Sequence, residues 1–275
     1  MTRASDTDHE DAARLAEEAG RLLLGIRARI EEGEAADRIR REGDLRSHEL
    51  LLSRLGDTHP DDAVFSEEGA DDLARLDAAR VWIVDPLDGT RGFARGGSFW
   101  GPLVALEFEG DIVAGAVGLP ALGETYFAGR GLGAYRDGER LAVSKVAEWS
   151  EATLSVGELK ALHVGSRADG VRSLIASAAS ARCYGDVAGC IQLLNGRAEA
   201  WLEAGVRPWD IAALKVLVEE AGGRFTDFDG GPRFLETGHA VASNSLLHMH
   251  VLRALAPAPK EPLSPPGAGR PPTRG

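Results

Sequence analysis

The sequence predicts a layered fold in which α-helices and β-strands are mixed. Three observations support this class: an amphipathic helical pattern near the N-terminus, a series of apolar strand-like segments between residues 80 and 128, and alternating strand and helix patterns after residue 160. The chain has 275 residues, of which 44% are hydrophobic, so it can bury a large core as one large domain or as two fused lobes.

The first half of the chain reads as two helices followed by strands. From Asp8 to Ile30, apolar residues recur at helical spacing and charged residues occupy the opposite face. A second helix is expected from about Leu45 to Leu55. The continuous apolar run from Arg80 to Asp85 predicts a buried strand that stops at Pro86. Turn signals between the later candidates favour a mainly antiparallel sheet. The other strand candidates are residues 63–65, 100–109, 112–119 and 125–128.

The second half alternates between strand and helix patterns. The expected strands lie near residues 161–165 and at 199–204 and 224–228, and the expected helices at 170–180, 188–195 and 210–221. Cys183 and Cys190 are seven residues apart, which places both on one buried helix face. His248 and His250 are expected at a solvated helix end. Residues 256–275 are rich in proline and glycine, which predicts a disordered tail.

Composition excludes several classes of function. The formal net charge is −12 and Lys and Arg do not cluster, so nucleic acid is not an expected partner. No apolar run has the length of a membrane span or of a signal-peptide core, so we expect a cytoplasmic protein that does not bind membranes. An acidic protein that binds phosphate needs positive charge from another source, and a bound metal ion is the simplest one.

The segment WIVDPLDGTRGF carries the strongest chemical signal. Asp85 leaves the buried strand, Pro86 bends the chain and Asp88 returns toward the same place, so two carboxylates can bind one divalent cation. The N–H groups after Asp88 can face a phosphate if a helix starts there. An ordinary surface turn is the alternative, although the buried WIV run weakens it. Calcium loops of the EF-hand type place glycine sixth, whereas Gly89 is fifth. The DxDGT signature of haloacid dehalogenase phosphatases has one residue between its aspartates, not two.

Three ordered segments together make the interpretation specific. Glu67 and Glu68 in FSEEG, then WIVDPLDGT, then PWDIAAL with Asp210 resemble the signatures of the inositol monophosphatase family, over about residues 15–252. The resemblance implies an α/β (α+β) fold, a layered αβαβα sandwich of the inositol monophosphatase and fructose-bisphosphatase type. It also implies one phosphatase domain over residues 1–255, built from two fused lobes, roughly 1–145 and 146–255. Relatives are commonly dimers, so a homodimer is expected.

The resemblance also implies roles for individual residues. The implied ligands of two or three Mg²⁺ ions are Glu67, Asp85, Asp88, Asp210 and the carbonyl of Leu87. The implied catalytic residues are Asp44 and Thr90, which activate the attacking water, together with Glu67. The implied substrate-binding residues are Asp88, Gly89 and Thr90 on the phosphate side and Gly185, Asp186, Val187 and Glu203 on the alcohol side. Crowded carboxylates raise one another's pKa until a cation neutralises them, so magnesium is an expected part of the site.

The local sequence around Asp44 allows a second interpretation of this residue. It could be the N-cap of the helix expected from Leu45. The arginine-rich stretch before it, EAADRIRREGD, is shorter than the mobile loop of many relatives.

The expected substrate is a small phosphorylated metabolite. The segments VGLPALGETYFAGRGLGAY, LAVSKVAEWSEATLS and VEEAGGRFTDFDGGP are most similar to the bacterial histidinol-phosphatase branch. Histidinol phosphate carries an ammonium and an imidazole, which Asp186 and Glu203 can bind. Inositol 1-phosphate and a 3′(2′),5′-bisphosphate nucleotide are the alternatives. The nucleotide would need a basic subsite, for which the candidates are Arg91, Arg95, Arg167 and Arg207. An inactive family member acting as a binding or regulatory protein is the alternative from another class, and the intact acidic residues argue against it.

Overall fold

A seven-stranded sheet forms the centre of the N-terminal half. The computed structural model describes residue 5 and residues 7–256. Strands of this sheet lie side by side in chain order; the first pair is parallel and the later pairs are antiparallel, which confirms the expected, mainly antiparallel sheet. The strands are β1 (Ala63–Ser66), β2 (Arg80–Asp88), β3 (Gly101–Phe108), β4 (Asp111–Leu119), β5 (Glu124–Gly129), β6 (Gly133–Arg136) and β7 (Glu139–Arg140).

A five-stranded sheet forms the second half, with the order β11-β12-β10-β8-β9. Its strands are β8 (Thr153–Val156), β9 (Ser180–Cys183), β10 (Ala200–Ala204), β11 (Arg224–Thr226) and β12 (His239–Ser243). The prediction of a strand near residues 161–165 is wrong. A short helix, α4 (Leu159–Leu162), begins just before it, because the Glu158 carboxylate accepts a hydrogen bond from the Lys160 N–H and starts a helical turn.

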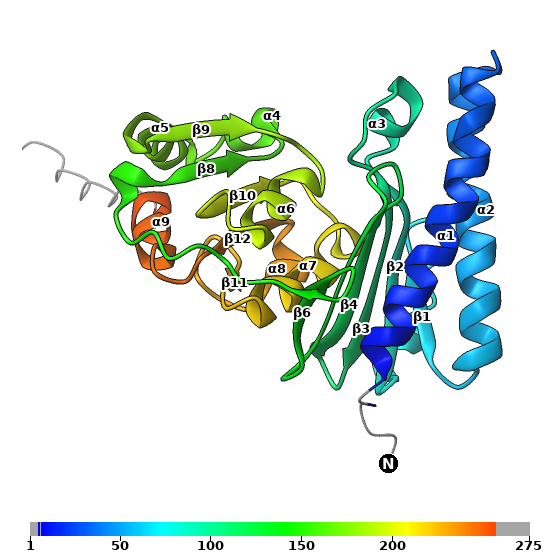
Figure 1. Cartoon of the computed structure of the whole chain (residues 1–275). Helices are drawn as coiled ribbons and strands as arrows, with labels where there is room; N and C mark the ends of the chain where they lie inside the picture. Colours follow the sequence, from blue (N-terminus) through cyan, green and yellow to red (C-terminus); the bar gives the residue numbers. More distant parts are fainter. Residues whose placement is uncertain (1–4, 6, 257–275) are drawn as a thin grey trace, which may run out of the picture.

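Helices form three layers that alternate with the two sheets (Figure 1). The longer helices are α1 (Asp8–Glu31), α2 (Ala36–Thr58), α5 (Ala168–Ser177), α6 (Ala188–Leu194), α7 (Pro208–Glu220) and α9 (His248–Leu255). The shorter ones are α3 (Thr90–Arg95), α8 (Phe234–Thr237) and the 3₁₀ turns η1 (Leu73–Asp77) and η2 (Trp149–Glu151). Helices α1 and α2 cover the outer face of the larger sheet, α6 and α7 lie between the sheets, and α5 and α9 cover the smaller sheet. The layer order αβαβα is confirmed.

Helix α2 begins nine residues earlier than the expected start at Leu45. Arg38 forms ion pairs with Glu34 and Glu42, each one helical turn away, and Arg29 of α1 pairs with Glu34 at 2.7 Å and with Glu42 at 2.5 Å. The pairs of Arg38, at spacing i, i+4, stabilise the polar first turns of α2. Because the helix includes Asp44, the N-cap reading of that residue is wrong.

Two predictions about single side chains are also wrong. Cys183 is exposed at the end of β9, whereas Cys190 is buried in α6, so the two do not share a helix. His248 is fully buried, where its ring contacts the Thr226 hydroxyl at 3.0 Å and the Ser243 hydroxyl at 2.8 Å. Apart from Ala256, the tail expected at residues 256–275 lies outside the described residues, and the lobe boundary near residue 145 stays a prediction. No helix in the described part of the chain has the length and apolar character that a membrane crossing requires.

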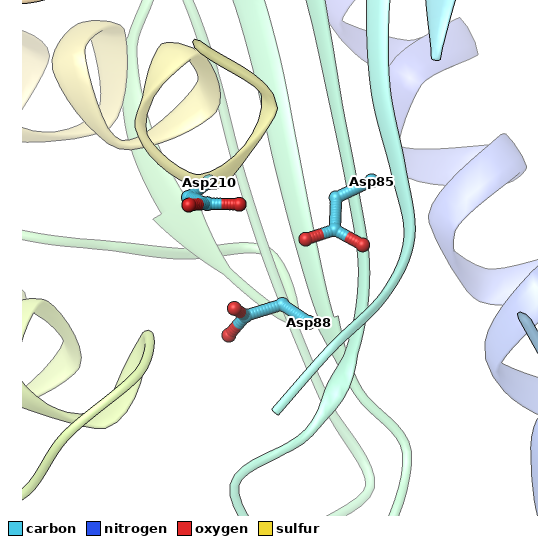
Figure 2. Close-up of side chains that lie close together, drawn as sticks. All are labelled: Asp85, Asp88 and Asp210. Carbon is cyan, nitrogen blue, oxygen red and sulfur yellow. The ribbon is translucent and has the colours of Figure 1, made fainter. Parts of the chain in front are cut away.

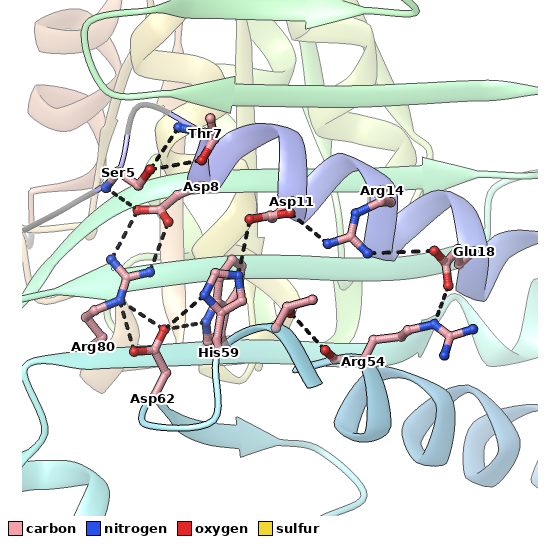
Figure 3. Close-up of polar contacts among 12 residues, drawn as sticks. Ser5, Thr7, Asp8, Asp11, Arg14, Glu18, Arg54, His59, Asp62 and Arg80 are labelled. Atoms are coloured by element: carbon pink, nitrogen blue, oxygen red, sulfur yellow. Dashed lines mark hydrogen bonds and ion pairs between the residues drawn. The ribbon is translucent and has the colours of Figure 1, made fainter. Parts of the chain in front are cut away.

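A buried ionic network joins α1 to the start of β2 (Figure 3). The Arg80 guanidinium contacts the Asp8 carboxylate at 2.9 Å and the Asp62 carboxylate at 2.9 Å, and these side chains are almost fully buried. Trp82 donates its indole N–H to Asp62 at 2.9 Å, and His59 lies between Asp62 and α1. Because both carboxylates rely on one cation, the start of β2 depends on Arg80.

Substitution Arg80→Ala should lower the free energy of unfolding by about 3 kcal/mol or more, because it leaves two buried carboxylates without their cation. Urea unfolding followed by circular dichroism measures the change. Arg130→Ala is the matched control: Arg130 pairs with Asp111 at the surface, so its loss should change stability by about 0.5 kcal/mol or less. If both substitutions have equally small effects, the buried network does not stabilise the fold more than a surface ion pair does.

Candidate active site

Two aspartates are held on one side of a bend at the end of β2. Strand β2 continues to Asp88, past the expected stop at Pro86, through a bulge: Asp85 is opposite Leu103 and Asp88 is opposite Gly101. The Asp85 carboxylate accepts the Leu87 N–H at 2.9 Å. The Pro86 carbonyl accepts the buried Ser47 hydroxyl of α2 at 2.7 Å. These contacts fix the bend from both sides.

Gly89 and Thr90 begin the short helix α3 directly after the bend. Gly89 has φ 72°, and a Cβ there would lie 2.5 Å from the Phe99 carbonyl oxygen, so only glycine fits. Phe93 anchors α3 by an edge-to-face contact with the buried Trp100, with ring centroids 4.8 Å apart. The backbone after Asp88 is therefore tightly held.

Asp210 reaches the same place from the opposite side (Figure 2). It lies in the first turn of α7, after Pro208, and accepts the Arg207 N–H at 2.7 Å in a capping arrangement. One carboxylate oxygen of each of Asp85, Asp88 and Asp210 lies within 4.8 Å of the others. Carboxylate oxygens are hard donors, which are the ligands that Mg²⁺ prefers, so the three aspartates fit a magnesium site.

Burial and mutual repulsion dominate the electrostatics of these aspartates. Burial raises the pKa of Asp85 well above its ordinary value, and the charges of Asp88, Glu67 and Asp210 raise it further. The pKa of Asp88 is also raised well above its ordinary value, by burial and then by Asp186 and Asp210. Burial is the largest cause that raises the pKa of Asp210 to about 6. A bound cation would remove this penalty.

Glu67 and Asp44 lie next to the three-aspartate cluster but outside it. The Glu67 N–H donates to the Val84 carbonyl at 3.2 Å, so this residue follows β1 directly beside β2. The residue is exposed overall, but its carboxyl group shares a hydrogen bond with Asp85, and burial of that group raises its pKa. Asp44 is buried on α2 beside Gly43, whose Cα faces the side chains of Leu87 and Phe93. Burial, with the charge of Glu68, raises the pKa of Asp44 to about 7. The Asp44 carboxylate pairs with Arg40 at 3.3 Å and lies near the charges of Glu67 and Glu68.

A pocket of about 420 Å³ adjoins the cluster. Its lining includes Asp88 and Asp210 of the cluster and all four residues expected on the alcohol side: Gly185, Asp186, Val187 and Glu203. The Val187 N–H donates to the Asp88 carboxylate at 3.1 Å, which ties the start of α6 to the cluster. Both Gly185 and Asp186 have left-handed backbone, with φ 69° and 44°. The left-handed backbone of this pair turns the chain around the pocket.

The pocket wall is strongly acidic. Among the described residues, five carboxylate side chains and no Lys, Arg or His line it; the acids are Asp88, Glu158, Asp186, Glu203 and Asp210. Burial raises the pKa of Glu203 to about 7, opposed by the N–H groups of Glu158 and Ala204. Burial raises the pKa of Asp186 as well, and the charge of Arg91 lowers it. The described residues of the pocket wall therefore offer negative charge and no basic side chain.

Sequence reasoning missed several residues of this site. Ser47, Gly157, Glu158 and Cys183 belong to no motif, and only the fold brings them to the bend or to the pocket. The four arginines considered for a second phosphate do not line the pocket. Arg167 instead pairs with Asp229 at 2.5 Å and donates to the Phe228 carbonyl at 3.0 Å.

Comparison with known proteins places the chain in a family. The model of the inositol monophosphatase family matches residues 6–260. The chain belongs to this family. Its members hydrolyse phosphate monoesters and depend on a metal ion, typically Mg²⁺, so the protein is a phosphatase that acts on small phosphorylated substrates.

Several individual relatives cover most of the chain. The histidinol-phosphatase of Chlorobaculum parvum is 35% identical over 251 residues, which make up 90% of this chain and 96% of the relative. The inositol-1-monophosphatase of Mesorhizobium japonicum is 34% identical over 227 residues, 81% of this chain and 83% of the relative. The solved structure of an inositol monophosphatase from Anabaena (Nostoc) sp. PCC 7120 has a TM-score of 0.81 at 27% identity, covering 91% of this chain and 95% of that one.

The metal-free protein should lose stability as the pH rises. Asp210 binds its proton more tightly in the folded protein, where its pKa is about 6, than at the ordinary value of 3.8. Folding is therefore favoured below pH 4, and stability falls as the pH rises to 6 and above. Mg²⁺ should raise the melting temperature by about 5 °C or more at pH 7.5 and by about half as much or less at pH 5. Differential scanning fluorimetry with EDTA or MgCl₂ measures this, with Asp210→Asn as the control. An equal rise at both pH values would contradict the electrostatic interpretation.

Proposed function

We propose that the protein is a magnesium-dependent phosphomonoesterase that hydrolyses histidinol phosphate to histidinol and phosphate. The observation that carries this proposal is the acidic pocket beside the three-aspartate cluster. Histidinol phosphate has a phosphate group, which metal ions at the cluster would bind, and an ammonium and an imidazole group. Carboxylates of the pocket can bind the ammonium and the imidazole by charge-assisted hydrogen bonds. The relative from Chlorobaculum parvum, named histidinol-phosphatase, supports the same choice.

In this proposal, the cluster and its neighbours hold the metal. Asp85, Asp88, Asp210 and Glu67, with the Leu87 carbonyl, would bind two or three Mg²⁺ ions. When bound, Mg²⁺ neutralises the carboxylates and polarises the phosphoryl oxygens. The bulge in β2 and the Ser47 hydroxyl keep the bend in place during the reaction.

The water that attacks phosphorus needs a base and an orienting group. Asp44 would accept its proton, since a pKa of about 7 leaves this carboxylate partly ionised at neutral pH and matched to proton transfer. Thr90 would orient the same water through its hydroxyl, and Glu67 would assist from the end of β1. The N–H groups of Gly89 and Thr90 would bind the phosphoryl oxygens, while the attacking water would lie opposite the departing alcohol oxygen.

The alcohol part of the substrate would lie in the pocket. Asp186 and Glu203 would bind the ammonium and the imidazole, and the backbone of Gly185 and Val187 would shape the wall between them and the cluster. Inositol 1-phosphate is the second candidate, favoured by the relative named inositol-1-monophosphatase and by the ability of carboxylates to accept hydrogen bonds from hydroxyl groups. A bisphosphate nucleotide is disfavoured because its second phosphate would face acidic side chains.

Phosphate release by the purified protein tests the proposal. The assay compares histidinol phosphate, inositol 1-phosphate, adenosine 3′,5′-bisphosphate and fructose 1,6-bisphosphate, each with MgCl₂ and with EDTA. We expect kcat/KM to be about tenfold or more higher for histidinol phosphate than for the others, and activity to be lost in EDTA. Preference for inositol 1-phosphate would overturn the choice of substrate. Absence of turnover with all four esters would favour a binding role.

Substitution Asp186→Asn tests the pocket directly. It removes one negative charge from the wall, so KM for histidinol phosphate should rise by about tenfold, with a smaller change in kcat. Steady-state kinetics measures both. Asp137→Asn is the control, because Asp137 lies at the β6–β7 turn outside this pocket. An unchanged KM in the Asp186 variant would contradict its assignment to the substrate cation.

A further inference from the structure

Gly157 lies directly against the carboxylate of Glu203. It follows β8 and leads into α4, and it lines the same pocket as Glu203. A Cβ built on Gly157 would overlap both carboxylate oxygens and Cδ of Glu203, which are the three atoms nearest to it. The Glu203 side chain is almost fully buried, at 4% exposure. Absence of a side chain at residue 157 therefore provides the space that the Glu203 carboxylate occupies.

The backbone of Gly157 is held by both neighbouring strands. Its N–H donates to the Leu202 carbonyl of β10 at 2.8 Å. Its carbonyl accepts the Cys183 thiol of β9 at 3.3 Å. Because hydrogen bonds to two strands fix its position, Gly157 cannot easily move away from Glu203.

The carboxylate itself has one engaged oxygen and one free oxygen. Oε1 of Glu203 accepts the Glu158 N–H at 2.5 Å and the Ala204 N–H at 3.1 Å. No donor in the described part of the chain contacts Oε2. One oxygen thus anchors the side chain, and the other can accept a hydrogen bond from a ligand in the pocket.

We propose that Gly157 is a positioning residue for substrate selection. It keeps the Glu203 carboxylate flat against the connection between β8 and α4, with Oε2 available to an N–H or O–H donor on the alcohol part of the substrate. The inference rests on the proposed function, since it assigns Glu203 to the substrate. It also explains why a side chain at residue 157 would interfere with substrate selection.

Backbone conformation does not itself require glycine at this position. Gly157 is not among the glycines with left-handed backbone, so alanine can adopt its conformation. In the variant Gly157→Ala, the nearest obstacle is the end of the Glu203 side chain, which can rotate away. The carboxylate would then lose the N–H groups of Glu158 and Ala204 and enter the pocket.

A double-mutant cycle tests this coupling. The four proteins are the wild type, Gly157→Ala, Glu203→Ala and the double variant, assayed with histidinol phosphate and with phenyl phosphate, whose alcohol part has no cation. Each single substitution should lower kcat/KM for histidinol phosphate by about 10- to 100-fold, mainly through KM, and should reduce the preference over phenyl phosphate. In the double variant, the loss should stay within about twofold of that of Glu203→Ala alone.

Multiplied losses in the double variant would overturn the proposal, because they would mean that Gly157 acts independently of Glu203. The control is Gly56→Ala on α2, where an added Cβ would meet no atom within 4 Å, and it should leave kinetics unchanged. A crystal structure of Gly157→Ala gives a second measurement that needs no turnover. It should show Glu203 away from the Glu158 N–H; an unmoved carboxylate with a shifted residue 157 would contradict the proposal.

The experiments distinguish a wrong choice of substrate from a wrong role for Gly157. If another ester is preferred, the same cycle is run with that ester, and coupling between residues 157 and 203 would support the positioning role while the choice of histidinol phosphate fails. If no ester is hydrolysed, the crystal structure alone decides the positioning role.

Discussion

Repulsion among Asp85, Asp88 and Asp210 is the constraint on which the site depends. Burial and mutual charge raise the pKa values of these carboxyl groups, so the protein holds them together at a cost to its own stability. A folded chain accepts such a cost only where the surrounding structure leaves no alternative arrangement. The bulge at the end of β2 and the first turn of α7 impose that arrangement (Figure 2).

The rest of the fold stabilises the two ends of β2 in different ways. At its start, the buried Arg80 network joins the strand to α1 and to the segment after α2 (Figure 3). At its end, Ser47 and the α3 anchor Phe93 hold the bend. The smaller sheet contributes the acidic pocket wall, with Glu203 on β10 and Gly157 after β8. In the proposed function, the metal ligands thus come from the larger sheet and α7, and the residues that select the substrate come from the smaller sheet and the connections at its strand ends.

Sequence patterns predict the features that depend on local interactions, and they fail for features that depend on contacts between distant segments. Asp85, Asp88 and Asp210 were recognisable because each lies in a local motif, and the layered fold followed from long periodic segments. Strands β8 and β9 were missed because they are four residues long and are defined by pairing with distant segments. The buried His248 was misjudged for the same reason, since Thr226 and Ser243 reach it from β11 and β12. Glu158 and Gly157 carried no signal, because only the fold brings them to Glu203.

In the proposed function, Asp85, Asp88 and Asp210 form a metal-dependent catalytic centre. The most direct measurement is the anomalous diffraction of crystals grown with MnCl₂, since Mn²⁺ takes the oxygen ligands of Mg²⁺ and scatters anomalously. The expected result is one or more anomalous peaks at about 2.0–2.4 Å from carboxylate oxygens of the three aspartates, absent in Asp85→Asn crystals. Full phosphatase activity in EDTA, together with no peak at this cluster, would show that the three aspartates are not a metal-dependent catalytic centre.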